Sequence, residues 1–124
     1  MRAECAATRY SFPYRDGLGE ERMSDAASET QQSICAWAEE TFGPAKSAAT
    51  LHARALPEME ELSDALRTGD RQEVAHELAD IVILLYRVAQ ESGVDLHTAI
   101  DEKMAINRAR QWVPAGDGTG KHVK

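Results

Sequence analysis

Two pairs of acidic residues are spaced so that each pair would share one face of a helix. Glu58 and Glu61 form the first pair, and Glu77 and Asp80 form the second. Residues three apart lie on the same side of a helix, and both pairs border an apolar stripe. Carboxylates avoid burial unless they are paired or bind a cation. On two antiparallel helices the four carboxylates could meet in a site for hard divalent metal ions.

Three polar residues further along the chain are candidates for phosphate binding. Lys103, Asn107 and Arg110 are separated by four and three residues, so they would share one helix face. An ammonium, an amide and a guanidinium group can all donate hydrogen bonds to phosphate oxygens. Upstream, Trp37 has the spacing of a core residue, and stacking on a nucleotide base is the alternative interpretation. A single nucleotide held through metal ions would fit these residue types.

Apolar residues at helical spacing predict four helices that would position these side chains. The predicted ranges are residues 24 or 28 to 42, 47–68, 70–92 and 95–111. Ser28 with Gln31, and Asp70 with Glu73, have the spacing of capping boxes, and Gly69 would end the second helix. The short link after the second helix would make it pack antiparallel to the third, which brings the two acidic pairs together.

Pro57 interrupts the pattern of the second helix. A proline inside a helix removes one hydrogen bond and costs about 3 kcal/mol. We therefore expect either a kink at Pro57 or a break, with the proline in the first turn of a new segment.

The chain is predicted to be one all-α domain, a four-helix bundle, with a short extension at each end. Its length of 124 residues suits one domain, and 43% hydrophobic but only 6% aromatic residues favour helices over sheets. Residues 1–23 are predicted to form an N-terminal arm, residues 24–112 the helical domain, and residues 113–124 a flexible, glycine-rich C-terminal tail.

Charge and composition argue against several classes of partner. The net charge of −7 disfavours a nucleic-acid polymer, since a phosphate backbone requires a basic surface. No segment approaches the roughly 18 apolar residues of a membrane span, and the first residues lack the apolar stretch of a signal peptide. Cys5 and Cys35 have no metal or redox spacing. We therefore expect a cytoplasmic protein whose partner is a small molecule.

The order of these motifs resembles the all-α nucleoside triphosphate pyrophosphohydrolases, the MazG-like superfamily. Its signature is Glu-Glu-x-x-Glu, a spacer, Glu-x-x-Asp, and then a helix with Lys, Asn and Arg. Both acidic pairs and the residues from Lys103 to Arg110 match it, and the similarity covers roughly residues 34–112. Pro57 departs from the signature because it replaces the first acid. That position is more peripheral to the metals in the family, so we expect activity to survive.

A narrower similarity concerns the phage and bacterial branch of dATP/dGTP pyrophosphohydrolases, which includes the MazZ-type enzymes. It rests on residues 37–43 and on the ending between Asn107 and Val123. The resemblance implies that a (d)NTP, in this branch dGTP or dATP, is hydrolysed to a (d)NMP and pyrophosphate. It also implies that two or three Mg²⁺ ions, which Mn²⁺ could replace, are held by the four acids, Glu58, Glu61, Glu77 and Asp80.

The resemblance also suggests roles for single residues and an assembly. Glu61 and Glu77 are the candidate catalytic acids, with Glu61 a candidate proton acceptor. Lys103, Asn107 and Arg110 would hold the pyrophosphate leaving group. Family members form dimers and tetramers, and a thin core from four helices would leave apolar surface for a partner. We therefore expect a homo-oligomer, a tetramer built as a dimer of dimers.

Two other interpretations remain open. A non-enzymatic helical dimerisation or adaptor module would explain the amphipathic helices equally well, but would leave the matched acidic edges as a coincidence. A di-iron protein of the ferritin type needs two Glu-x-x-His motifs. The sequence offers only Glu73-x-x-His76, without a second copy.

Overall fold

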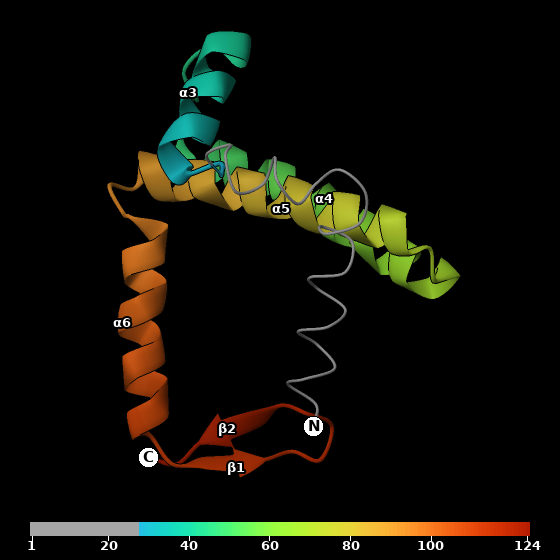
Figure 1. The fold of residues 1–124 in the computed structure, drawn as a ribbon, viewed down its shortest axis with the longest axis vertical. Coiled ribbons are helices and arrows are strands. Elements are labelled where there is room, and N and C mark those ends of the chain that lie inside the picture. The colour runs from blue at the N-terminus through green and yellow to red at the C-terminus, as the bar shows by residue number, and fades with distance from the viewer. Residues whose placement is uncertain (1–27) are drawn as a thin grey trace. The chain divides into compact units, whose positions relative to one another are not determined.

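The computed structural model describes residues 28–124, in which four helices are followed by a two-stranded hairpin (Figure 1). The elements are α3 (Gln31–Phe42), α4 (Ala48–Thr68), α5 (Arg71–Glu91), α6 (Leu96–Ala109), β1 (Trp112–Pro114) and β2 (Gly120–His122). The mostly helical fold with four helices is therefore as predicted. The proposed N-terminal arm, and a start of the first helix at Ser24, lie outside the described residues.

Local capping explains where α4 and α5 begin and end. The Ser47 hydroxyl accepts a hydrogen bond from the Thr50 amide at 3.1 Å, and the Asp70 carboxylate accepts from the amides of Gln72 and Glu73. Gly69 ends α4 in the left-handed region with φ of +78°, and its amide donates to the Ala65 carbonyl. These boundaries agree with the predicted ones to within a residue.

The predicted capping box between Ser28 and Gln31 is wrong. Helix α3 begins at Gln31, so Gln31 is not in the third position of a helix capped by Ser28. Its amide instead donates to the Gln90 side chain at 2.9 Å and to the Val94 carbonyl at 2.8 Å. Gln31 is buried because it fills the space beside the link between α5 and α6.

Helix α4 runs through Pro57 without the break that the sequence left open. Proline cannot donate to the carbonyl one turn earlier, which costs about 3 kcal/mol. Ala55 and Glu58, on either side of the proline, are buried at 5% and 9% exposure. The packing of this stretch on α5 offsets the lost hydrogen bond.

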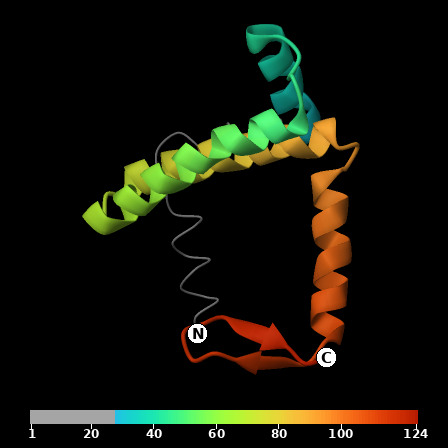
Figure 2. The same ribbon diagram turned by 180° about the vertical axis from the view of Figure 1, so that it is seen from behind.

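Helices α4 and α5 lie side by side and antiparallel, joined by the tight link at Gly69 (Figures 1 and 2). Helix α3 packs on α5. The buried apolar side chains are mostly small: Ala38, Leu51, Ala55, Ala65, Ile81 and Ala89. Alanines allow two helix backbones to approach closely, so the pairing of α4 with α5 is set by this seam.

Helix α6 does not pack along the other described helices, and none of its residues is buried. The predicted bundle is therefore incomplete within one chain, in which α3, α4 and α5 pack together. A hydrogen bond of 2.8 Å between the Tyr86 hydroxyl and the His97 ring connects the start of α6 to α5. The apolar side of α6, with Ile100 and Met104, stays exposed.

The segment predicted as a flexible tail contains an antiparallel hairpin. Trp112 pairs with His122, and Pro114 pairs with Gly120. A Cβ atom at position 120 would lie 2.6 Å from the Val113 carbonyl oxygen, so this strand requires glycine there. The Trp112 indole donates to the Asn107 carbonyl at 2.7 Å and ties the hairpin to the end of α6. Strands of three residues carry too little alternation to be recognised in the sequence.

Within residues 28–124, no helix has the length and apolar character that crossing a membrane demands.

Candidate metal and nucleotide site

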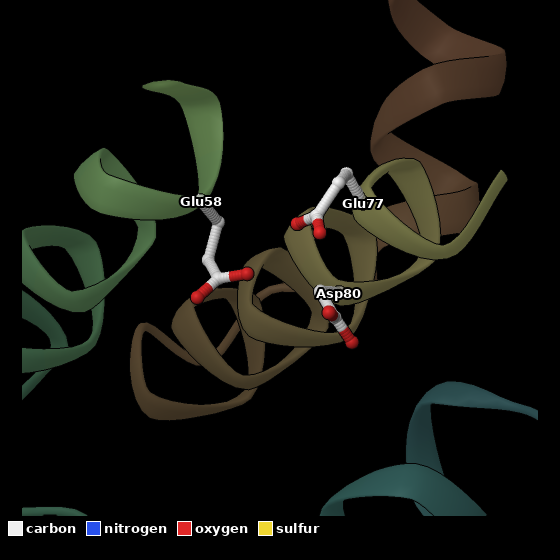
Figure 3. A group of neighbouring side chains, drawn as sticks. All are labelled: Glu58, Glu77 and Asp80. Carbon is white, nitrogen blue, oxygen red and sulfur yellow. The ribbon is translucent and has the colours of Figure 1, made fainter. Parts of the chain in front are cut away.

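Three of the four predicted acids meet between α4 and α5. Glu58 comes from α4, and Glu77 and Asp80 come from α5 (Figure 3). One carboxylate oxygen from each lies within 4.8 Å of the others. The antiparallel pairing and the short link at Gly69 bring these acids together, as the spacing of the two pairs predicted.

The electrostatics of this cluster are unfavourable for three charged carboxylates without a cation. Partial burial raises the pKa of Glu77 above its ordinary value, and the negative charges of Glu61, Glu58 and Asp80 raise it further. The Oε1 atom of Glu77 is buried and accepts no hydrogen bond. An oxygen without a partner beside two more carboxylates suits a bound cation.

Glu61, the fourth predicted acid, lies outside this close cluster and is exposed. Its charge still acts on Glu77, and the two residues line a common pocket of about 290 Å³. Thr68 and Glu73, near the link between the helices, line the same pocket. Glu61 is therefore a neighbour of the cluster and not one of its three converging carboxylates.

The donor set suits a hard divalent cation. Three carboxylates provide oxygen ligands of the kind that Mg²⁺ and Mn²⁺ prefer, and they leave other coordination positions for water or phosphate oxygens. No histidine belongs to the cluster among the residues that the structure describes, and His76 is exposed. A di-iron site of the Glu-x-x-His type is not formed by this part of the chain.

Arg54 is a neighbour of the cluster that sequence reasoning missed. It lies one turn before Glu58 on α4, and its Nη1 atom donates to Glu58 Oε2 at 3.2 Å. The Glu58 side chain is 11% exposed, whereas the Arg54 side chain is 63% exposed. The signal that could have revealed this pair is an arginine four residues before an acid at the edge of the apolar stripe.

An aromatic pocket of about 420 Å³ adjoins the acids. Its lining residues come from α3, α4 and α5: Trp37, Phe42, Arg54, Glu58, Asp80, Ile83, Leu84 and Arg87. The Trp37 and Phe42 rings meet edge to face at 5.5 Å, and the Arg87 guanidinium lies 5.9 Å from the centre of the Phe42 ring. The pocket thus combines flat apolar faces and cations with two acids of the cluster.

Trp37 is 53% exposed, so its interpretation as a core residue is wrong. Helix α3 packs on α5 through Ala38, which leaves the neighbouring indole at the pocket wall. This position is open to a ring stacked on its face.

The phosphate-binding candidates lie apart from the acids. Among residues 28–124, no hydrogen bond or ion pair joins Lys103, Asn107 or Arg110 to the carboxylate cluster. Arg110 follows the last residue of α6 with an extended backbone, so the predicted shared helix face holds only for Lys103 and Asn107. The Oδ1 atom of Asn107 is buried without a hydrogen-bond partner. The physical reason for the separation is that α6 does not pack along α4 or α5.

The comparisons with known proteins agree in one family. A model of the MazG-like family matches residues 45–124. The dATP/dGTP diphosphohydrolase of Salmonella phage PMBT28 is 38% identical over 95 residues, which are 77% of this chain and 31% of that protein. The dATP/dGTP diphosphohydrolase of Cyanophage S-2L is 37% identical over 101 residues, 82% of this chain and 91% of that protein. The chain thus spans about a third of the first relative and most of the second.

A solved structure has the same fold. It is the Cyanophage S-2L MazG-like pyrophosphohydrolase bound to dGDP and three catalytic Mn²⁺ ions per active site. Its TM-score to this chain is 0.62 at 36% sequence identity, and the match covers 76% of this chain and 89% of that one.

Proposed function

The chain belongs to the MazG-like family, and from this premise we propose that it is a Mg²⁺-dependent nucleoside triphosphate pyrophosphohydrolase. Its substrate is a (d)NTP, with dGTP or dATP preferred, and its products are the (d)NMP and pyrophosphate. The observation that carries the proposal is the cluster of Glu58, Glu77 and Asp80 at the edge of an aromatic pocket. Phage relatives named as dATP/dGTP diphosphohydrolases support the choice of a purine deoxynucleotide.

The three clustered carboxylates would hold the metal ions. The fit rests on three converging oxygens and on the buried, unpartnered Oε1 atom of Glu77. When bound there, Mg²⁺, or Mn²⁺ in its place, would supply charge neutralisation of the polyphosphate and would lower the pKa of attacking water. The related structure with three Mn²⁺ ions per active site supports a site for two or three ions.

The remaining site residues have distinct proposed roles. Glu61 is exposed beside Glu77, so it can accept a proton from attacking water without losing a buried interaction. Glu77 would help to hold the ions that neutralise the charge of the reacting phosphate. The exposed indole of Trp37 stacks on the base in the aromatic pocket. Lys103, Asn107 and Arg110 bind the pyrophosphate group.

We propose that a second copy of the chain completes the site in a homo-oligomer, a tetramer arranged as a dimer of dimers. Large apolar side chains are exposed on both packed helices: Leu56, Met59, Leu66, Leu78, Val82 and Leu85. Surface of this kind on neighbouring helices favours a protein partner. Packing α6 of one copy against another would cover its exposed apolar side and bring Lys103 and Asn107 toward a carboxylate cluster.

Product analysis tests the enzymatic proposal. The protein is incubated with each dNTP and NTP, with Mg²⁺ or with a chelator, and the products are separated by ion-exchange chromatography. We expect a monophosphate and pyrophosphate only with the metal, and fastest from dGTP or dATP. The variant Glu77→Gln should lose roughly 100-fold or more in kcat.

Glu60→Gln is the matched control, because Glu60 is an exposed acid on α4 that lies two residues from the buried Glu58, which puts the two on different sides of that helix. It should retain the activity of the wild-type protein. Formation of a diphosphate and orthophosphate would contradict the proposed bond cleavage. No turnover with any nucleotide would favour the helical adaptor module instead.

A further inference from the structure

The ion pair between Arg54 and Glu58 sits where the metal site and the aromatic pocket meet. Both residues line the pocket, and Glu58 also belongs to the carboxylate cluster. The guanidinium is the one cation with an ion pair to the cluster among residues 28–124. The Glu58 carboxylate therefore pairs with Arg54 on its own helix, and it would also be a ligand of any cation held by Glu77 and Asp80.

These two uses of Glu58 compete electrostatically. The Arg54 guanidinium donates at 3.2 Å to one oxygen of the Glu58 carboxylate, so a divalent ion bound to the same carboxylate would be its close neighbour. Like charges at that separation repel each other, and partial burial of Glu58 limits screening by water. The arginine therefore neutralises part of the acidic cluster and opposes metal binding at the same time.

The two side chains differ in their freedom to move. The Glu58 side chain is 11% exposed and held in the seam between α4 and α5, whereas the Arg54 side chain is 63% exposed. An arginine side chain is long and can change rotamer at little cost when most of it is in water. Separation of the pair therefore moves Arg54 and leaves Glu58 in place.

We propose that Arg54 is a displaceable counter-ion, which pairs with Glu58 in the metal-free protein and turns to the substrate's polyphosphate when Glu58 ligates a metal ion. This inference rests on the proposed function. A guanidinium forms two parallel hydrogen bonds with phosphate oxygens, so a polyphosphate in the adjoining pocket offers Arg54 a partner as good as the carboxylate it leaves. Arg54 then opposes binding of metal alone and favours binding of metal together with phosphate.

The first test measures Mn²⁺ binding without nucleotide, by electron paramagnetic resonance of the free ion. In Arg54→Gln the competing cation is gone, and we expect Mn²⁺ to bind roughly three- to tenfold more tightly than to the wild-type protein. Arg54→Lys keeps the charge and should stay near the wild-type affinity. Weaker or unchanged binding to Arg54→Gln would overturn the proposal, because it would make Arg54 a group that only positions Glu58.

The second test measures binding of pyrophosphate at saturating Mn²⁺ by calorimetry. Pyrophosphate has no base, so the result does not depend on Trp37. We expect Arg54→Gln to bind it roughly tenfold more weakly, with partial recovery in Arg54→Lys. Equal affinity of wild-type protein and Arg54→Gln for pyrophosphate would contradict the second half of the proposal.

Arg67→Gln is the control in both titrations. Arg67 lies on the same helix, is also exposed, and pairs with Asp64, which is not one of the three clustered acids. It should match the wild-type protein for both ligands. A wild-type protein that binds no Mn²⁺ would count against the proposed function itself, whereas Mn²⁺ binding of equal strength in wild-type and Arg54→Gln would count against this inference alone.

Discussion

The Glu77 side chain destabilises the fold when no cation is bound, and the same surroundings make it a candidate ligand of a divalent cation. One of its carboxylate oxygens has no hydrogen-bond partner, and partial burial together with nearby acids raises the pKa of its carboxyl group. Without a cation this arrangement weakens the fold. The same arrangement would offer a divalent cation three oxygen ligands with few competing partners in the described residues.

Glu77→Gln should therefore stabilise the metal-free protein at neutral pH. The pKa of Glu77 is raised in the folded state. Its contribution to the stability of the fold is therefore fully present below the ordinary glutamate pKa of 4.5, and it is lost as the pH rises through the raised pKa. Glutamine imitates the protonated form at every pH. Melting temperatures measured in a chelator should show a gain for the variant at pH 7 that shrinks toward pH 4.

With Mg²⁺ present, the wild-type protein should become more stable than Glu77→Gln. At a concentration of 100 times its dissociation constant, a ligand of the folded state alone adds about 2.7 kcal/mol of stability. We expect a gain of this size for the wild-type protein and little for Glu77→Gln. Equal stabilisation of both proteins by Mg²⁺ would show that the cluster is not the metal site.

Trp37→Ala should raise the KM for the preferred dNTP roughly tenfold, since a stacked base contributes about 1–3 kcal/mol. Trp37→Phe keeps a flat face and should recover most of the loss. Because the residue is 53% exposed, neither variant should disturb folding. Steady-state kinetics with dGTP and dATP provide the measurement, and an unchanged KM in Trp37→Ala would place the base elsewhere.

At the scale of the elements, one buried glutamine fixes the junction of three helices. Gln31 at the start of α3 donates to the Gln90 side chain on α5 and to the Val94 carbonyl in the link that follows it. Its Oε1 atom accepts from the Leu96 amide at 2.8 Å, at the first residue of α6. One side chain thus provides hydrogen-bond partners for the Val94 carbonyl and the Leu96 amide.

Gln31→Ala should lower the free energy of unfolding by about 1–3 kcal/mol, because buried polar groups lose their partners. Gln32→Ala, at the exposed neighbouring position, should stay within about 0.5 kcal/mol of the wild-type protein. Urea denaturation followed by circular dichroism measures both. Similar stabilities of the two variants would mean that water replaces the Gln31 hydrogen bonds.

At the scale of the whole molecule, the described chain buries little and exposes much apolar surface. Its core consists mainly of alanines, and no large side chain among the described residues is fully buried. On α5, Leu78, Val82 and Leu85 are spaced along one face and are 47%, 42% and 40% exposed. A second copy that covers this face would bury apolar side chains that one chain leaves in water.

Leu85→Glu should therefore dissociate the proposed oligomer, since a charge buried at an apolar interface is costly. Sedimentation velocity should give a multiple of the chain mass for the wild-type protein and a lower multiple for the variant. His52→Glu, on the exposed side of α4, is the control for added charge. A wild-type protein that sediments as a single chain would reject the assembly.

Much of the candidate site could be predicted from sequence because its information is local. Caps at Ser47, Asp70 and Gly69 act within a few residues, so the ends of α4 and α5 follow from short motifs. A tight link then leaves the two helices one simple way to pack. The spacing of Glu77 and Asp80 on that frame was enough to bring them together with Glu58.

What surrounds the acids was decided only by tertiary structure. Phe42, Arg54 and Arg87 come from three helices, and which of their faces meet depends on how α3 settles on α5 through Ala38. The same packing leaves Trp37 at a pocket wall, although its helical spacing is that of a core residue. The position of α6 likewise depends on contacts far apart in the chain. Periodicity reports which side of a helix is apolar, but the partner that covers that side is set by the packing of the whole fold.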